Sequence, residues 1–233
     1  MKIELFDRYD IRTRICAFIF VISPFLLDAY ILVEAVRSLA STFILSVTLV
    51  AASGIFTCWV RYLGNTVTQV DYITEFLLPD AKELNDVTRN RYIEKLCALE
   101  PGLVGLTSHD PLVRREAAQS ASVWLREKMR GEDFRLVQEE GLNYGFFRNV
   151  YAVKRTFLWT YTAYTAFLVA IVWITNQGST FLEYLGAIPG THVLCGLVHV
   201  AAYTIWWFGI TEKLFHFVSK KYARAVVRAI DRL

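Results

Sequence analysis

Four stretches of the chain are long and apolar enough to cross a lipid bilayer as helices. A helix needs roughly 20 mostly apolar residues to cross about 30 Å of hydrocarbon, because lipid offers no partner for unpaired backbone groups. A tight polar connection joins the first stretch to the second, and residues 176–192 join the third to the fourth. The pattern predicts two transmembrane helical hairpins. Their spans are residues 15–33, 39–60, 156–175 and 193–210.

The residues between the two hairpins are more charged and have helical periodicity. Apolar residues recur every three or four positions from Val67 to Leu77, just before Pro79. They recur in the same way from Tyr92 up to Pro101. This spacing is typical of a helix with one apolar face, and proline ends such a helix. Two short amphipathic helices are therefore predicted here.

Two further helices are predicted before the third span. Asp110 followed by Pro111 is a typical helix start, because aspartate caps the first turn and proline fixes φ. This helix is expected to run to about Met129, and another from about Asp133 into the third span. The predicted fold class is all-α: a polytopic membrane protein with four transmembrane helices, arranged as two hairpins with a cytoplasmic helical domain between them.

The chain is thus expected to have five segments. They are an N-terminal segment (1–14), transmembrane hairpin 1 (15–60), a helical domain (61–155), transmembrane hairpin 2 (156–211) and a basic C-terminal helix (212–233).

Positive charges predict the orientation of the spans. The loop 176–192 has no Lys or Arg, and cytoplasmic span ends carry an excess of both in bacterial membrane proteins. The loop should therefore face outward, with both termini and the helical domain around Leu106 in the cytoplasm. We expect a multi-pass protein of the bacterial inner membrane. The residues that carry this bias are Lys2, Arg8, Arg12, Arg14, Arg61, Lys154, Arg155, Lys213, Lys220, Lys221 and Arg224.

Aromatic and basic residues mark the expected cytoplasmic boundary of the bilayer. An indole ring is most stable where apolar and polar surroundings meet, and basic side chains bind anionic lipid there. Anchoring to lipid is favoured over ligand binding for these residues. The expected anchors are Trp59, Arg148, Lys154, Arg155, Trp159, Trp206 and Trp207.

Composition supports a membrane protein and reduces the kinds of functional site that we expect. Hydrophobic residues make up 55% of the chain, and the mean hydropathy is +0.35, more than a soluble domain of this size needs. The net charge of +3 is too small to indicate direct nucleic-acid binding. The four cysteines lie far apart, and His192, Cys195 and His199 on one helix face do not complete a metal site. With no catalytic motif, we expect neither an enzyme nor a cofactor.

Three polar residues are expected at one depth in the membrane. Asp28 lies fourteen residues after Arg14, about 21 Å into the bilayer at 1.5 Å per residue. His199 lies fourteen residues before Lys213, and Ser46 fifteen before Arg61, so they reach a similar depth. A buried carboxylate there needs a proton, water or a partner, and His199 is the nearest candidate. The layer is a structural hydrogen bond or part of a gate or ion path, or else Asp28 faces lipid and its carboxyl extends towards the membrane surface.

Two further sets of residues have two interpretations each. Arg89, Arg91, Arg114 and Arg115 form either a solvated helix face or a surface that senses a phosphate-bearing nucleotide signal. Gly141 and Gly145 either bend a juxtamembrane connector or let another helix approach closely in an oligomer.

Residues 86–92 (DVTRNRY) and 141–149 (GLNYGFFRN), with Lys154, resemble a family of small bacterial membrane proteins. These proteins have two helical hairpins around a cytoplasmic helical segment and are loosely associated with anti-phage defence loci. The resemblance covers residues 81–154 and the span layout. It implies no functional residues.

The leading functional hypothesis is a membrane effector. Such a protein would oligomerise and permeabilise or depolarise the inner membrane when its cytoplasmic segment receives a signal, from a cytosolic sensor protein or a nucleotide. Polar residues at depth and a sensor-sized polar segment motivate this hypothesis. The alternatives are a small housekeeping channel or transporter, and a non-conducting scaffold that docks a cytosolic partner.

Overall fold

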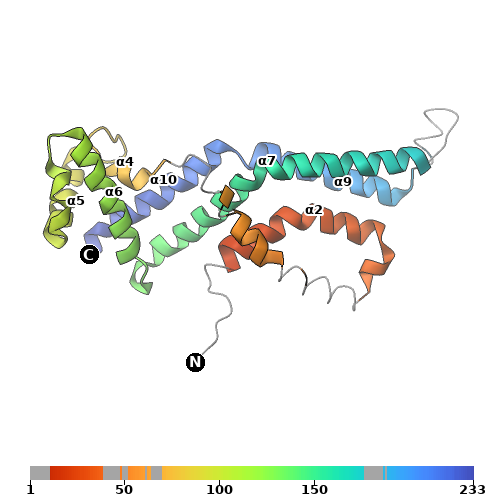
Figure 1. Ribbon diagram of the computed structural model, residues 1–233, viewed down its shortest axis with the longest axis horizontal. Coiled ribbons are helices and arrows are strands. Elements are labelled where there is room, and N and C mark those ends of the chain that lie inside the picture. The colour runs from red at the N-terminus through yellow and green to blue at the C-terminus, as the bar shows by residue number, and fades with distance from the viewer. Residues whose placement is uncertain are drawn as a thin grey trace, which may run out of the picture. The chain divides into compact units, whose positions relative to one another are not determined.

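The computed structural model describes residues 11–38, 48, 52–60, 62–63, 70–175, 186 and 188–233, and every regular element in them is helical (Figure 1). For these residues the all-α prediction is confirmed. Three helices are long and apolar enough to cross a membrane: Ile11–Leu32, Arg135–Thr175 and Gly190–Gly209. Most of the second predicted span, including Ser46, and most of the loop 176–192 lie outside the described residues. Residues 52–60 of that span are helical.

The chain divides into two compact units, which are described separately. The membrane unit comprises the described residues within Met1–Val67 and Phe146–Leu214. The second unit comprises those within Thr68–Gly145 and Phe215–Leu233. The sequence suggested that the C-terminal helix is a segment of its own, whereas in the structure its residues from Phe215 onward complete the second unit.

The membrane unit is built from three long helical segments. Helix α2 packs against α9. The named elements of the membrane unit are the π-helix η1 (Ile11–Ile15), α2 (Cys16–Leu32), the 3₁₀-helix η2 (Glu34–Arg37), α7 (Arg135–Thr175) from residue 146, α9 (Gly190–Thr204) and the π-helix η5 (Ile205–Gly209).

A proline in α2 is accommodated by the serine before it. Pro24 has no N–H, so the carbonyl of Phe20 loses its usual backbone donor. The hydroxyl of Ser23 donates to that carbonyl at 2.9 Å instead. Because lipid offers no substitute donor, this bond lets α2 continue one more turn to Asp28.

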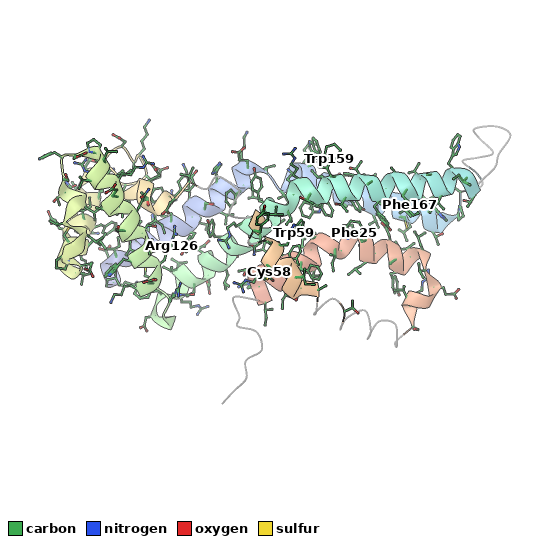
Figure 2. All side chains as sticks on the ribbon, in the orientation of Figure 1. Phe25, Cys58, Trp59, Arg126, Trp159 and Phe167 are labelled. Atoms are coloured by element: carbon green, nitrogen blue, oxygen red, sulfur yellow. The ribbon has the colours of Figure 1, made fainter. Side chains whose placement is uncertain are left out.

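An aromatic core holds the membrane unit together. The ring of Phe157 stacks on Trp206, with 3.9 Å between ring centroids, and on Tyr161 at 5.1 Å. Phe25 of α2 meets Tyr161 edge to face at 5.1 Å, and Figure 2 shows Phe25 on the side of α2 that faces α7. Aromatic pairs contribute about 0.5–1.5 kcal/mol each beyond area burial. These contacts fasten α2 and η5 to α7.

Two side chains of α7 donate hydrogen bonds to backbone carbonyls in η1 and directly after η5, the two π-helical turns. The Asn149 amide donates to the carbonyl of Thr13 in η1 at 2.7 Å. The Lys154 ammonium donates to the carbonyl of Ile210, directly after η5, at 2.6 Å. A π-helical turn disturbs the regular bonding of the backbone, so these carbonyls need donors from elsewhere.

The second unit is a bundle of shorter helices. It contains α4 (Tyr72–Leu77), α5 (Asp86–Leu99), η3 (Pro101–Thr107), α6 (Pro111–Lys128), η4 (Glu132–Phe134), the first turns of α7, α10 (Glu212–Ala229) from residue 215, and η6 (Ile230–Arg232).

The starts of these helices follow their capping residues. Helix α6 begins at Pro111, and the Asp110 carboxylate accepts from the Leu112 N–H at 2.9 Å, as predicted. Helix α4 begins later than the apolar pattern indicated, because Asp71 caps it and accepts from the Ile73 N–H at 3.2 Å. Val70 lies before this cap and is not helical.

The C-terminal helix contributes much of the core of the second unit. Val226, Val227 and Ile230 are fully buried against apolar residues of α4, α5 and α6. The opposite face of α10 is charged, and its Lys220 pairs with Glu83 at 2.9 Å. This hydrogen-bonded pair raises the pKa of Lys220 and lowers the pKa of Glu83. The basic C-terminal helix is thus an amphipathic structural element.

A buried arginine closes the turn between α4 and α5. Arg89 is 4% exposed, and its guanidinium donates to the carbonyls of Pro79, Ala81 and Leu84 at 2.6–3.0 Å. It also pairs with Asp86 at 2.6 Å. A guanidinium has five donors in a rigid fork, so one side chain satisfies several carbonyls of an irregular turn.

We predict that Arg89→Met destabilises the second unit much more than Arg115→Met. The first change leaves several buried acceptors without a donor and should lower the free energy of unfolding by about 3 kcal/mol. Arg115 forms an exposed ion pair with Glu75, so its loss should cost less than about 1 kcal/mol. Pulse proteolysis in urea on the purified full-length protein measures both, and equal losses would contradict the role given to Arg89.

Candidate functional site: a buried polar cluster

An aspartate and a histidine from different helices meet inside the membrane unit. Asp28 of α2 is 0% exposed, and His199 of α9 is 7% exposed. The Nε2 atom of His199 lies 3.1 Å from Oδ2 of Asp28. The structure therefore brings together two of the three residues that the sequence placed at one depth. The third, Ser46, lies outside the described residues.

Further polar groups surround the Asp28 carboxyl. The Cys195 thiol of α9 and the Tyr164 hydroxyl of α7 lie close to it. In the described residues the two carboxyl oxygens accept no full hydrogen bond, and Nε2 of His199 forms none either, so the pair is a close contact of two polar groups. The imidazole of His199 is the cation-forming group nearest to this carboxyl.

The third helix fixes the orientation of His199. The Thr165 hydroxyl of α7 lies 2.9 Å from Nδ1, so both ring nitrogens of the imidazole face polar atoms. The ring of Tyr161 stacks on the imidazole with 4.8 Å between centroids. These contacts leave His199 little freedom to turn away from Asp28.

The sequence analysis did not identify the contribution of α7. Tyr161, Tyr164 and Thr165 occur at i, i+3 and i+4, so they share one face of the helix. That spacing of hydroxyl groups within an apolar span was a readable signal. Their connection to Asp28 depends on packing between distant parts of the chain.

The cluster holds no evident metal site. No group of three or more His, Cys, Asp or Glu side chains among the described residues is arranged to bind a metal ion. All four cysteines are free thiols. Cys97 lies in the second unit, where its thiol donates to the Leu103 carbonyl at 3.5 Å and burial raises its pKa.

The four arginines suggested as a sensing surface contact four different segments. Arg89 is turned inward to the 79–86 turn, and Arg91 pairs with Asp231 at 3.0 Å. Arg114 donates to the Ser108 carbonyl, and Arg115 pairs with Glu75. The structure therefore does not gather them into one cluster. The buried Arg89 guanidinium is not accessible to a signal molecule.

Some of the expected membrane anchors are exposed, and others make contacts within the protein. Trp159 is 71% exposed and projects from α7 in Figure 2, and Trp59, Arg155 and Trp207 are also exposed. Arg148 is half-buried and has an interaction partner in the protein. Lys154 donates to backbone carbonyls, as described above.

Trp206 does not face lipid as the sequence suggested. Its ring is 1% exposed and stacks on Phe157 in the aromatic core. Trp206 and Trp207 are adjacent on a helical turn and point in different directions, so the exposed position is filled by Trp207. Trp206 is a packing residue.

The two glycines of α7 lie in the second unit and do not interrupt the helix. A Cβ atom at Gly141 would lie 3.3 Å from the Tyr222 ring of α10, so glycine permits this close approach. The neighbouring Tyr144 stacks on the same Tyr222 ring, with 5.3 Å between centroids. Gly145 is buried. In the structure, Gly141 therefore serves packing within one chain.

We predict that His199→Leu destabilises the protein more than the double change Asp28→Leu with His199→Leu. The single variant leaves the buried Asp28 without its partner, which costs about 3 kcal/mol. The double variant removes both polar groups and should lose less than about 1 kcal/mol relative to the unchanged protein. Thermal unfolding in detergent gives the comparison, and additive losses would show that the two side chains are not coupled.

No protein-family model, curated protein or solved structure matches this chain. The site is therefore interpreted from its own geometry and chemistry, and the resemblance to the defence-associated family stays a prediction.

Proposed function

We propose that this chain is a bacterial inner-membrane effector that oligomerises and raises the permeability of the membrane to ions when its cytoplasmic part receives a signal. The observation that carries the proposal is the Asp28–His199 pair, at 3.1 Å and almost fully buried between membrane-spanning helices. In this proposal the pair lies on the ion path or gates it.

The physical argument is the cost of ionisable groups in lipid. A charged side chain at the centre of a span costs about 2.5–3.5 kcal/mol on insertion scales, so such residues mark ion pathways and proton relays. A purely structural hydrogen bond needs no ionisable partners, since threonine, serine or asparagine provides one at a lower cost. The surrounding hydroxyl and thiol groups add further exchangeable protons to the cluster.

The proposed topology has four spans, as two hairpins, with both termini and the second unit in the cytoplasm. It is supported by the three apolar helices of the structure, the helical residues 52–60, and the distribution of Lys and Arg at the span ends. The second unit then supplies the surface on which a cytosolic sensor protein or a nucleotide acts.

Oligomerisation is supported by the outer surface of the membrane unit. Trp159, Phe167 and Trp173 are each more than half exposed on α7, which suits lipid or a second copy. Gly54 and Gly196 have open space where a side chain would project, so a neighbouring helix is able to approach closely. Several copies side by side would provide the continuous path that permeation requires. Anti-phage defence is the proposed setting, on the strength of the family resemblance alone.

The topology predicts which introduced cysteines react with an impermeant thiol reagent in intact cells. On a background without the four native cysteines, position 180 should be labelled, because its loop faces outward. Gln119 is exposed on α6, and a cysteine there should be labelled only after the cells are permeabilised. Labelling of position 119 in intact cells, with position 180 protected, would reverse the assignment.

The effector proposal predicts that overexpression depolarises bacterial cells and stops growth, and that Asp28→Asn weakens both effects. Asparagine keeps the size of the side chain but removes its charge and its exchangeable acid proton. The change should reduce the rate of depolarisation by about tenfold, as measured with a potential-sensitive dye.

The matched control is Asp80→Asn, the same chemical change at an exposed residue of the second unit. It should depolarise cells like the unchanged protein. Full membrane potential in cells that contain confirmed high levels of the unchanged protein would refute the effector function.

A further inference from the structure

A row of hydrogen-bonding groups leads from the buried pair to the surface of the membrane unit. The Nδ1 atom of His199 lies 2.9 Å from the Thr165 hydroxyl. The Tyr203 hydroxyl lies 3.3 Å from the Thr165 hydroxyl and 3.1 Å from that of Thr162. With Asp28 at one end and Thr162 at the other, five side chains from α2, α9 and α7 form this row, the Asp28–Thr162 row.

Exposure increases along the Asp28–Thr162 row. Asp28 and His199 are buried, Thr165 and Tyr203 are half-buried, and Thr162 is exposed. The row therefore connects an enclosed ionisable group to the outside of one copy. Under the proposed topology, Thr162 lies about 10 Å beyond Arg155, at 1.5 Å per residue, and thus towards the cytoplasmic side.

The hydrogen bonds assign the protons in this part of the molecule. The Thr165 hydroxyl donates its single proton to the Tyr161 carbonyl at 2.8 Å, so it accepts from both of its other neighbours. Nδ1 of His199 therefore carries a hydrogen. Nε2 lies 3.1 Å from the facing Asp28 oxygen, which is close enough for a proton to pass between them once the two groups align.

The Tyr203 hydroxyl is able to change its hydrogen-bond acceptor. Its hydroxyl has one hydrogen and two acceptors within reach, Thr165 and Thr162, so rotation about one bond redirects the proton. The Thr165 hydroxyl likewise turns between the Tyr161 carbonyl and Nδ1 of His199. Tyr161 also has a buried hydroxyl without a hydrogen-bond partner in the described residues, close to Asp28 and Tyr203.

We propose that the Asp28–Thr162 row is the cytoplasmic part of a proton path and that the ion which crosses is H⁺, an inference that rests on the proposed function. Side-chain atoms 2.9–3.3 Å apart are in contact, which leaves no room for a hydrated metal ion between them. Protons alone pass along such a row, because each group takes one proton and releases another.

The transfer is balanced at every step. Before the transfer Asp28 is a carboxylate and His199 carries its hydrogen on Nε2, whereas the hydrogen bonds of the structure correspond to the state after the transfer, with the hydrogen on Nδ1. A proton that arrives at Thr162 passes to Tyr203, Tyr203 gives its own to Thr165, and Thr165 gives its own to Nδ1. The imidazole then releases the Nε2 proton to Asp28. Each hydroxyl ends with one hydrogen, the imidazole ends neutral in the other tautomer, and Asp28 gains one proton. For a second transfer, Asp28 has to release this proton towards the opposite face, and the imidazole has to return to its first tautomer.

Other ionisable side chains also face the Asp28 carboxyl. Cys195 approaches it from α9, and Tyr161 and Tyr164 approach it from α7. All three are neutral when protonated, so His199 is the one group among these neighbours that is able to accept a proton and become a cation.

The test uses the purified full-length protein in vesicles of phosphatidylethanolamine and phosphatidylglycerol that contain a pH-sensitive dye. A potassium gradient with valinomycin makes the inside negative and drives proton entry. The protein is reconstituted at a density high enough to favour the oligomer by mass action without the signal. The unchanged protein should then acidify the interior, at a rate that does not depend on replacing the external sodium or chloride. Tyr203→Phe and Thr165→Val each interrupt the row and should slow acidification by about tenfold or more.

Matched controls separate the row from general damage. Thr175→Val removes a hydroxyl that donates to its own helix at 2.8 Å, as Thr165 does, but at an exposed position of α7. Thr204→Val does the same in α9, next to Tyr203. Both should conduct like the unchanged protein. Size-exclusion profiles and helical circular dichroism verify that each variant is folded, and Tyr203→Phe retains the aromatic ring.

The outcomes distinguish the two proposals. Acidification that survives both Tyr203→Phe and Thr165→Val overturns the proton path, as does a permeability to potassium or sodium without acidification, and either leaves the effector function standing. Vesicles that stay impermeable to protons, potassium and sodium alike overturn the effector function itself. Loss of proton entry in the two row variants, with the controls unchanged, supports the path.

Discussion

The membrane unit depends on one constraint: lipid offers no hydrogen-bond partner, so a polar group within the spans is costly unless other polar groups of the protein surround it. Some polar groups find their hydrogen-bond partner within the same helix. Ser23 replaces the donor that Pro24 lacks, one turn before Asp28. Where the helix is widened, the partner comes from another helix, as Asn149 serves the carbonyl of Thr13. The same constraint explains why the Asp28 carboxyl lies against His199.

The polar cluster is held by apolar packing as much as by its own contacts. The rings of Phe157, Trp206 and Tyr161 stack in sequence, and Phe25 fixes α2 against them. Tyr161 belongs to both systems, since its ring also stacks on the His199 imidazole. The aromatic core therefore sets the distances within the cluster. The proposed proton path needs such fixed geometry, because transfer requires heavy atoms within hydrogen-bond reach.

The second unit is organised by different physics. Here water competes for polar groups, and the helices are joined by an apolar core supplemented by a few multiply bonded side chains. Arg89 holds the turn before α5, and Asp71 caps α4 while it accepts from Ser122 and Arg126 of α6. Charged residues that suggested a sensing surface thus have structural partners. Any signal-binding surface on this unit must use groups other than the buried Arg89.

The sequence by itself determined the helical class of the described residues, the Pro111 start of α6, three apolar helices and the expectation that His199 is the partner of Asp28. These follow from local properties, namely capping chemistry, the length of an apolar run and a constant rise per residue. Tertiary structure alone decided that Trp206 is buried while Trp207 is exposed, that α10 completes the second unit, and that Thr165 and Tyr203 extend the cluster. The physical reason is that the face a helix presents to a neighbour depends on packing between residues far apart in the chain, which the spacing along one helix does not contain.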